Sequence, residues 1–138
     1  MRRSAPSGPR GVLEVDWPFF GEICRALALR VARDYQPEIV LGIAKAGVIP
    51  GVVVASIRGR RILLVDETCD TGSTMKLALS EVRALGPAEV RTAVSFKTGE
   101  YAPDYHAFET DSFIILPWDR EIIQGGELVL RPEYAARL

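Results

Sequence analysis

Residues 61–77 read Arg-Ile-Leu-Leu-Val-Asp-Glu-Thr-Cys-Asp-Thr-Gly-Ser-Thr-Met-Lys-Leu. The apolar run at 62–65 predicts a buried strand, which ends in two adjacent carboxylates, Asp66 and Glu67. After the polar loop that follows, apolar residues recur at helical spacing and predict a helix over 74–85. A buried strand that leads through such a loop into a helix is typical of a parallel α/β sheet.

The loop at 70–74 is a candidate phosphate site. Its amides and the first free N–H groups of the following helix point to one region, and the helix dipole favours an anion there. Asp66 and Glu67 would repel a phosphate, so we expect them to face sugar hydroxyls, a magnesium ion, or both. A phosphate on one side and a diol on the other indicate a ribose 5-phosphate. The alternative is an ordinary turn in which the acids are solvated and the hydroxyl side chains only cap the helix.

The alternation of helix and strand continues along the chain. Asp16 and Pro18 predict the start of a helix that runs to about residue 34. The other predicted elements are a strand at 39–43, a helix at about 48–55, a strand at 90–96 and a strand at 113–116. We therefore expect an α/β fold, with a parallel, Rossmann-like sheet flanked by helices, in a single domain over residues 1–138. Residues 1–12 are predicted to form a mobile tail.

The composition argues against several classes of protein. Lys and Arg number 17 against 18 acids, so no overall positive charge indicates nucleic-acid binding. No apolar run approaches the roughly 20 residues that a membrane span needs, and the first residues lack the apolar core of a signal peptide. The two cysteines make no disulfide framework, and His106 is predicted to lie in a surface loop rather than to act as a base. We expect a cytoplasmic protein that binds neither nucleic acid nor membrane.

The run at 63–74 closely resembles the phosphoribosyl pyrophosphate (PRPP) motif of the type I phosphoribosyltransferases. This resemblance implies the fold of that family, with a small hood at about residues 100–120. It also implies that Asp66 and Glu67 contact the ribose hydroxyls and that the loop binds the 5′-phosphate. The implied phosphate ligands are Thr71, Gly72, Ser73 and Thr74.

A second loop, at 42–47, follows the first predicted strand and carries Lys45 between Ala44 and Ala46. Small residues let the backbone approach a ligand closely. By itself such a lysine is more often simply solvated, but beside the first loop it supplies a counter-charge for pyrophosphate. The segment resembles the pyrophosphate loop of the same family, which implies a non-proline cis peptide near Ala44 and Lys45.

A third region consists of residues 96–97 and 101–119, of which 111–119 read Asp-Ser-Phe-Ile-Ile-Leu-Pro-Trp-Asp. This region resembles the hood of the xanthine-guanine and hypoxanthine-guanine phosphoribosyltransferases. The resemblance implies that Lys97 bonds the purine O6, that Phe113 stacks on the ring and that Ile114 offers backbone groups to the base edge, with Asp119 closing the segment. A lysine only donates hydrogen bonds, so it favours an oxopurine over adenine. The alternative is that Phe113 belongs to the core and Lys97 is exposed.

The function expected from these features is transfer of the 5-phosphoribosyl group from PRPP to a 6-oxopurine, which yields a nucleoside 5′-monophosphate and pyrophosphate. Asp70 is the expected acceptor of the purine proton near N7. The expected cofactor is Mg²⁺, bound near Asp66 and Glu67 through ribose hydroxyls or water, and the expected assembly is a homodimer or larger homo-oligomer. Two alternatives stay open: a non-catalytic regulatory relative that binds PRPP or nucleotide, and an unrelated phosphosugar enzyme of similar topology.

The sequence departs from the resembled family between residues 56 and 61, where relatives carry another strand and a flexible lid. Such a lid excludes water from the reacting centre. One explanation is that a lid is missing from this sequence, which we favour because the other site residues are present. The other explanation is a natural short form, whose turnover should leak toward PRPP hydrolysis.

Overall fold

The computed structural model describes residues 11–43 and 56–138. The chain divides into two compact units, Gly21–Thr110 and Met1–Phe20 with Asp111–Leu138. We call them the core unit and the terminal unit and describe each by itself. The single domain expected over 1–138 stays a prediction.

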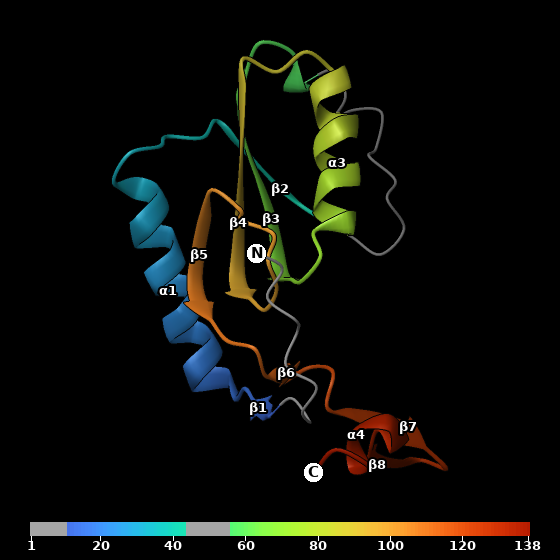
Figure 1. Ribbon diagram of the computed structural model, residues 1–138. Coiled ribbons are helices and arrows are strands. Elements are labelled where there is room, and N and C mark those ends of the chain that lie inside the picture. Colours follow the sequence, from blue (N-terminus) through green and yellow to red (C-terminus); the bar gives the residue numbers. More distant parts are fainter. Residues whose placement is uncertain (1–10, 44–55) are drawn as a thin grey trace, which may run out of the picture. The chain divides into compact units, whose positions relative to one another are not determined.

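The core unit is built on a four-stranded sheet in the order β2-β3-β4-β5 (Figure 1). Its strands are β2 (Ile39–Gly42), β3 (Arg61–Cys69), β4 (Glu89–Lys97) and β5 (Tyr105–Glu109). All three pairings are parallel, with Leu64 opposite Leu41 on one side and opposite Thr92 on the other. The predicted parallel α/β sheet is therefore confirmed, while β5 was not predicted.

Helices cover both faces of this sheet (Figure 1). One face packs against α1 (Trp17–Ala32) in a cluster made of Leu27, Val31, Tyr35, Leu63 and Ala93. The other face packs against α3 (Ser73–Ala84) in a cluster made of Ile57, Ile62, Leu64, Cys69, Met75, Val82 and Val94. The predicted N-cap of the first helix is confirmed, because Asp16 Oδ1 accepts a hydrogen bond from the amide of Phe19 at 2.8 Å.

One strand boundary and the placement of His106 differ from prediction in ways that affect the site. The strand predicted at 62–65 continues to Cys69, because β3 keeps pairing with β4 beyond Asp66, as in Thr68 opposite Phe96. The acid pair therefore lies inside the strand rather than after it. His106 lies in β5 and not in a surface loop, and its Nε2 is 3.6 Å from Glu109 Oε2.

The terminal unit contains two small sheets. β1 (Val12–Glu14) pairs in parallel with β6 (Phe113–Ile115), so the tail predicted over 1–12 is wrong at Val12, and residues 1–10 lie outside the described part. β7 (Glu121–Gln124) and β8 (Glu127–Leu130) form an antiparallel hairpin that was not predicted. Its two-residue turn uses Gly125 and Gly126 at φ 62° and 86°, the left-handed conformation that such turns need. A short helix, α4 (Pro132–Ala135), follows.

The connection into β3 is a tight turn. The amide of Arg60 donates to the carbonyl of Ile57 at 3.1 Å, and the amide of Gly59 donates to Gly86 O at 2.9 Å. Gly59 has φ +72°, and the Ile57 side chain is fully buried. Residues 56–61 therefore form a short turn into β3, and both explanations for the short connection stay predictions. The helix predicted at 48–55 lies outside the described residues.

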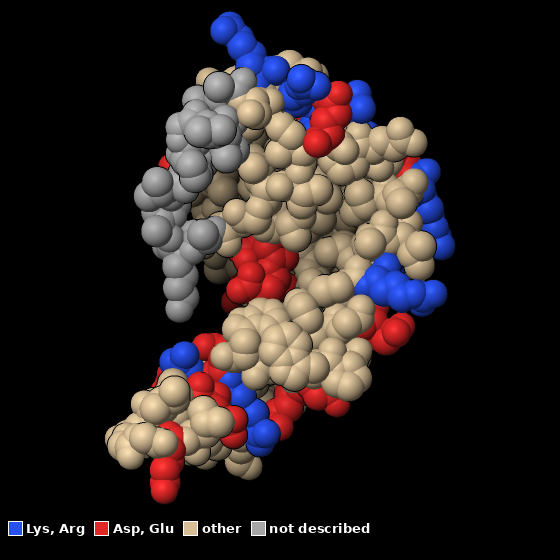
Figure 2. Space-filling view, turned by 180° about the vertical axis from the view of Figure 1, so that it is seen from behind, with Lys and Arg blue, Asp and Glu red and all other residues tan. Residues whose placement is uncertain are grey.

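Charged side chains are distributed over the surface. On the face shown in Figure 2, Lys and Arg lie in separate groups between acidic and uncharged residues, in keeping with the near-neutral composition. Within residues 11–43 and 56–138, no helix is both long enough and apolar enough to cross a membrane.

Candidate active site

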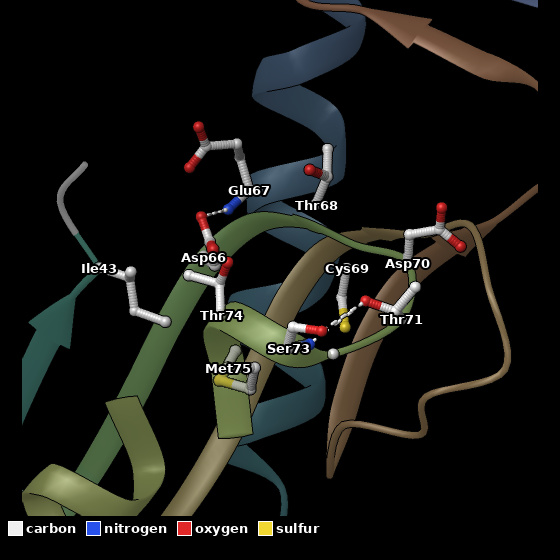
Figure 3. A pocket seen from close by; sticks show the side chains of 11 residues that line it. Ile43, Asp66, Glu67, Thr68, Cys69, Asp70, Thr71, Ser73, Thr74 and Met75 are labelled. Atoms are coloured by element: carbon white, nitrogen blue, oxygen red, sulfur yellow. Dashed lines mark hydrogen bonds between the residues drawn. The ribbon is translucent and has the colours of Figure 1, made fainter. Parts of the chain in front are cut away.

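A pocket of about 430 Å³ opens at the carboxyl ends of β2 and β3, where the N-terminus of α3 also lies (Figure 3). This is the edge at which parallel α/β sheets bind ligands. The pocket is lined by Ile43, Asp66, Glu67, Thr68, Cys69, Asp70, Thr71, Gly72, Ser73, Thr74 and Met75. The structure thus brings together the acid pair and the phosphate loop that the sequence predicted as one site.

The acid pair forms one side of this pocket. Asp66 Oδ1 accepts the backbone N–H of Glu67 at 2.8 Å (Figure 3). Burial, followed by the hydrogen bond that Asp66 shares with the Glu67 side chain, raises the pKa of Asp66 to about 7. The pair can therefore bind a cation or accept a hydrogen bond from a ligand near neutral pH.

The acid pair fits Mg²⁺ only with help from a ligand. In the described ranges, 11–43 and 56–138, no group of three or more His, Cys, Asp or Glu is arranged to hold a metal ion. Mg²⁺ commonly uses one or two carboxylates together with substrate oxygens and water. Asp66 and Glu67 supply carboxylates of that kind, so the donor set suits an ion that arrives with a phosphorylated substrate.

The other side of the pocket is the turn from β3 into α3. Gly72 caps the helix in the left-handed conformation, φ 79° and ψ 8°, without a side-chain hydrogen bond. Thr71 Oγ1 lies 3.0 Å from Ser73 Oγ and accepts the amide of Ser73 at 3.3 Å (Figure 3). An α-helix leaves its first N–H groups without helical partners, and here they adjoin the pocket. The geometry is that of an anion site.

Lys97 lies at the end of β4 and has defined partners. Its Nζ donates to Gly99 O at 2.7 Å and to Glu109 Oε1 at 2.9 Å, and its side chain is only 13% exposed. The alternative of an exposed Lys97 is therefore wrong. Gly99 also adjoins Asp70, since a methyl group built on Gly99 would lie 2.6 Å from the Asp70 carbonyl carbon and closer still to Asp70 Oδ1.

Sequence reasoning missed Gly99, Tyr101 and Glu109. Glu109 could have been predicted as a site residue from its position at the end of Tyr105–Glu109. An acid at the end of a strand is the same pattern that identified Asp66. Gly99 and Tyr101 carry no such local signal, since their contacts are with residues about 30 positions away.

Three predicted base-site residues belong to the terminal unit. The guanidinium of Arg137 lies 4.1 Å from the centre of the Phe113 ring, and the Tyr134 ring packs edge-on at 5.8 Å. Asp119 accepts hydrogen bonds from the Tyr134 hydroxyl and, at 2.9 Å, from Arg131. Both side chains are thus used in packing of that unit, and the roles of Phe113, Ile114 and Asp119 in substrate binding stay predictions.

The predicted pyrophosphate loop cannot be placed. Ala44, Lys45 and Ala46, with the expected cis peptide, lie outside the described residues. The last described residue before them is Ile43, whose amide donates to Val65 O at 3.0 Å. Ile43 itself therefore lies beside β3 and lines the pocket.

Cys69 is not suited to nucleophilic chemistry. It is buried in the cluster under α3, and burial raises the pKa of its thiol. The thiolate is the reactive form of cysteine, so the thiol is inert at neutral pH.

Comparisons with known proteins agree with this geometry. Over 74 residues the chain is 34% identical to hypoxanthine-guanine phosphoribosyltransferase from Homo sapiens, which covers 49% of this chain and 34% of the human protein. The chain therefore spans about a third of the length of the curated relatives it matches.

Solved structures share the fold. A purine phosphoribosyltransferase from Pyrococcus horikoshii Ot3 superposes with a TM-score of 0.67 at 24% identity, covering 84% of this chain and 99% of that one. A xanthine-guanine-hypoxanthine phosphoribosyltransferase from Helicobacter pylori gives 0.61 at 16% identity, over 78% of this chain and 93% of that one. The sequence model of the phosphoribosyl transferase domain matches residues 52–128, more than half of the chain, and the chain therefore belongs to that family.

Proposed function

We propose that this protein transfers the 5-phosphoribosyl group of PRPP to a 6-oxopurine, with release of pyrophosphate, as a purine-salvage enzyme. The observation that carries the proposal is the single pocket in which an open helix N-terminus faces a carboxylate pair. A ribose 5-phosphate offers a dianion at one end and two hydroxyls at the other. The two sides of the pocket match these two ends in charge and in hydrogen-bonding character.

In this mechanism the chain holds the ribose at both ends. The amides and hydroxyls of residues 71–74 bind the 5′-phosphate, while Asp66 and Glu67 accept hydrogen bonds from the ribose hydroxyls. Fixing both ends orients C1′ for attack by the base, and the positive charge that develops on the ribose lies close to the carboxylates. A bound Mg²⁺ would add positive charge beside the leaving pyrophosphate. Lys45 is the proposed protein cation for that group.

The preference for an oxopurine rests on Lys97 and Asp70. Both adjoin the backbone of Gly99: Lys97 Nζ donates to its carbonyl, and Asp70 Oδ1 lies against its Cα. In a 6-oxopurine, O6 and N7 are neighbouring atoms on one edge of the ring. A donor for O6 and a carboxylate for the N7 proton are therefore needed next to each other, and the two side chains provide this pair. The identity with the human hypoxanthine-guanine enzyme supports the same class of base.

A second candidate is a relative that binds PRPP or nucleotide without turnover. The observation in its favour is the short turn at 57–60, at a place in the chain where the resembled family carries a lid. A reacting centre that stays open to water loses the charge stabilisation that a dry site provides. Binding residues would then be present while transfer is slow.

One set of measurements separates these candidates. Pyrophosphate release would be followed with PRPP, Mg²⁺ and each of guanine, hypoxanthine, xanthine and adenine, and PRPP binding would be followed by calorimetry. We expect turnover with at least one oxopurine, and a kcat/KM with adenine lower by about tenfold or more, the value of one charged hydrogen bond. PRPP binding without release for any base supports the second candidate, and absence of PRPP binding contradicts both.

We also propose that the protein works in the cytoplasm as a homodimer or larger homo-oligomer. Light scattering coupled to size-exclusion chromatography tests the assembly directly. A mass near the monomer value of 15.2 kDa at micromolar concentration would contradict it.

A further inference from the structure

The ring of Tyr101 lies directly against the Cα of Gly72. A methyl group built on Gly72 would be 2.8 Å from Tyr101 Cβ and closer still to Cγ and Cδ2. Real Cβ atoms are not found this close to other carbons, so the ring occupies the space that any side chain at this position would need. The ring and the glycine therefore fit together as one packing unit.

The segment that carries Tyr101 is fastened to the end of β3. The amide of Thr98 donates to Cys69 O at 2.8 Å, and the amide of Tyr101 donates to Asp70 O at 3.4 Å. Between them, the Cα of Gly99 lies against Asp70. The loop after β4 thus runs alongside the loop after β3, with two backbone hydrogen bonds just before the point where the ring meets Gly72.

Tyr101 reaches this position from outside the pocket. Gly72 lines the pocket, and Tyr101 is not among the lining residues. The ring is partly buried against the cluster under α3, and Lys76 Nζ lies 5.5 Å from its centre, one turn along the helix from Gly72. The ring therefore supports the first turn of α3 from behind and leaves the ligand side open.

The conformation that the ring supports is a demanding one. Gly72 has φ 79°, and the direction of the chain changes there from the strand into the helix. Glycine has many accessible conformations, so an unsupported glycine at the mouth of a ligand site costs conformational entropy each time the ligand binds. Packing on one side of Gly72 reduces that cost before the ligand arrives.

We propose that Tyr101 is a positioning residue for the phosphate site. It acts through Gly72, holds the left-handed turn in place, and so keeps the first N–H groups of α3 directed at the 5′-phosphate. The inference rests on the proposed function for the identity of the ligand, a sugar phosphate, but its packing contacts stand independently of it.

The test compares Tyr101→Ala with Tyr101→Phe. The phenylalanine variant keeps the ring over Gly72 and serves as the matched control. We expect Tyr101→Ala to raise the KM for PRPP and the Kd for ribose 5-phosphate about tenfold, since small displacements in a binding site cost between one and two orders of magnitude. The KM for the base should stay within about twofold. Tyr101→Phe should match the wild type in all three, and Tyr101→Leu replaces Tyr101→Ala if the latter does not fold.

Amide NMR spectra of the ligand-free variants provide a second measurement. The ¹⁵N order parameters of Gly72 and Ser73 should fall in Tyr101→Ala and stay unchanged in Tyr101→Phe. Unchanged order parameters, or an unchanged Kd for ribose 5-phosphate in a folded Tyr101→Ala, would overturn the positioning role. Failure of the wild type itself to bind ribose 5-phosphate would overturn the proposed function and leave the NMR comparison as a valid test of the packing.

Discussion

Replacing Lys97 by alanine tests the base-recognition part of the proposed function. In the described structure two of the three N–H donors of its ammonium group are directed at Gly99 O and Glu109 Oε1, which leaves the third for a purine carbonyl. A hydrogen bond from a charged group contributes about 1.5–3 kcal/mol, and about 1.4 kcal/mol corresponds to a factor of ten. Lys97→Ala should therefore lower kcat/KM for the preferred oxopurine by about tenfold to about 150-fold.

Glu109→Gln provides the matched control for this substitution. The Glu109 side chain is 60% exposed, and exposed ion pairs contribute about 0–1 kcal/mol, so its loss should change kcat/KM by at most about fivefold. The assay is pyrophosphate release at saturating PRPP with guanine and with hypoxanthine, and the KM for PRPP should be unchanged in both variants. If Lys97→Ala turned over both bases as the wild type does, Lys97 would not contact the base and the assigned oxopurine preference would lose its basis.

Three further predictions concern the acid pair, the glycine turn and the short connection. The pKa of Asp66 is about 7 against an ordinary 3.8, so the folded protein holds more protons than the unfolded chain between these values, and its free energy of unfolding falls as pH rises through that window. Asp66→Asn should remove this fall in the free energy of unfolding. The measurement is urea unfolding of the wild type and of Asp66→Asn at pH 4.5 and pH 7.5. An equal change in the free energy of unfolding between the two pH values in both proteins would contradict the assignment. Gly72→Ala should lower Tm, because Gly72 has a positive φ and the Tyr101 ring occupies the space that a side chain would need. Adding Tyr101→Ala to Gly72→Ala should recover part of that loss of Tm. Strictly additive losses in the double variant would argue against the packing contact. Because residues 56–61 form only a short turn, the enzyme should slowly hydrolyse PRPP when Mg²⁺ is present and the base is absent. The assay measures pyrophosphate release from PRPP. A release rate no faster than that in buffer alone would contradict an open site.

The parts of the fold that could be predicted are those with local signals. The parallel sheet could be predicted because short apolar runs alternate along the chain with segments of helical periodicity. The acid pair and the phosphate loop could be predicted as one site because they lie within nine residues of each other in the chain. A site assembled from one strand, one turn and one helix start is visible in sequence because its geometry is fixed by neighbouring residues. This explains why the residues from Asp66 to Thr74 line one pocket as expected.

The parts that could not be predicted depend on distant pairing. β5 was not predicted, because it is a short run of five residues and its strand identity comes from pairing with β4, as in Phe108 opposite Phe96. β1 has three residues and exists only because Phe113 and its neighbours pair with it. Lys97 was expected at the base site through a resemblance only, and its contact with Glu109 depends on the pairing of β4 with β5.

Gly72 shows how the structure changes the meaning of a residue that sequence had already selected. The resemblance implied Gly72 as a phosphate ligand, and from that role alone a bulky substitution is expected to abolish PRPP binding in an otherwise intact protein. The structure adds a positive φ and a tyrosine ring on the side away from the pocket, and both oppose any side chain without reference to ligand. Loss of PRPP binding in Gly72→Val would therefore report on the turn as much as on the phosphate. Substitutions at Tyr101 leave the glycine in place and change only its support, which makes them the sharper test of how this turn creates a binding site.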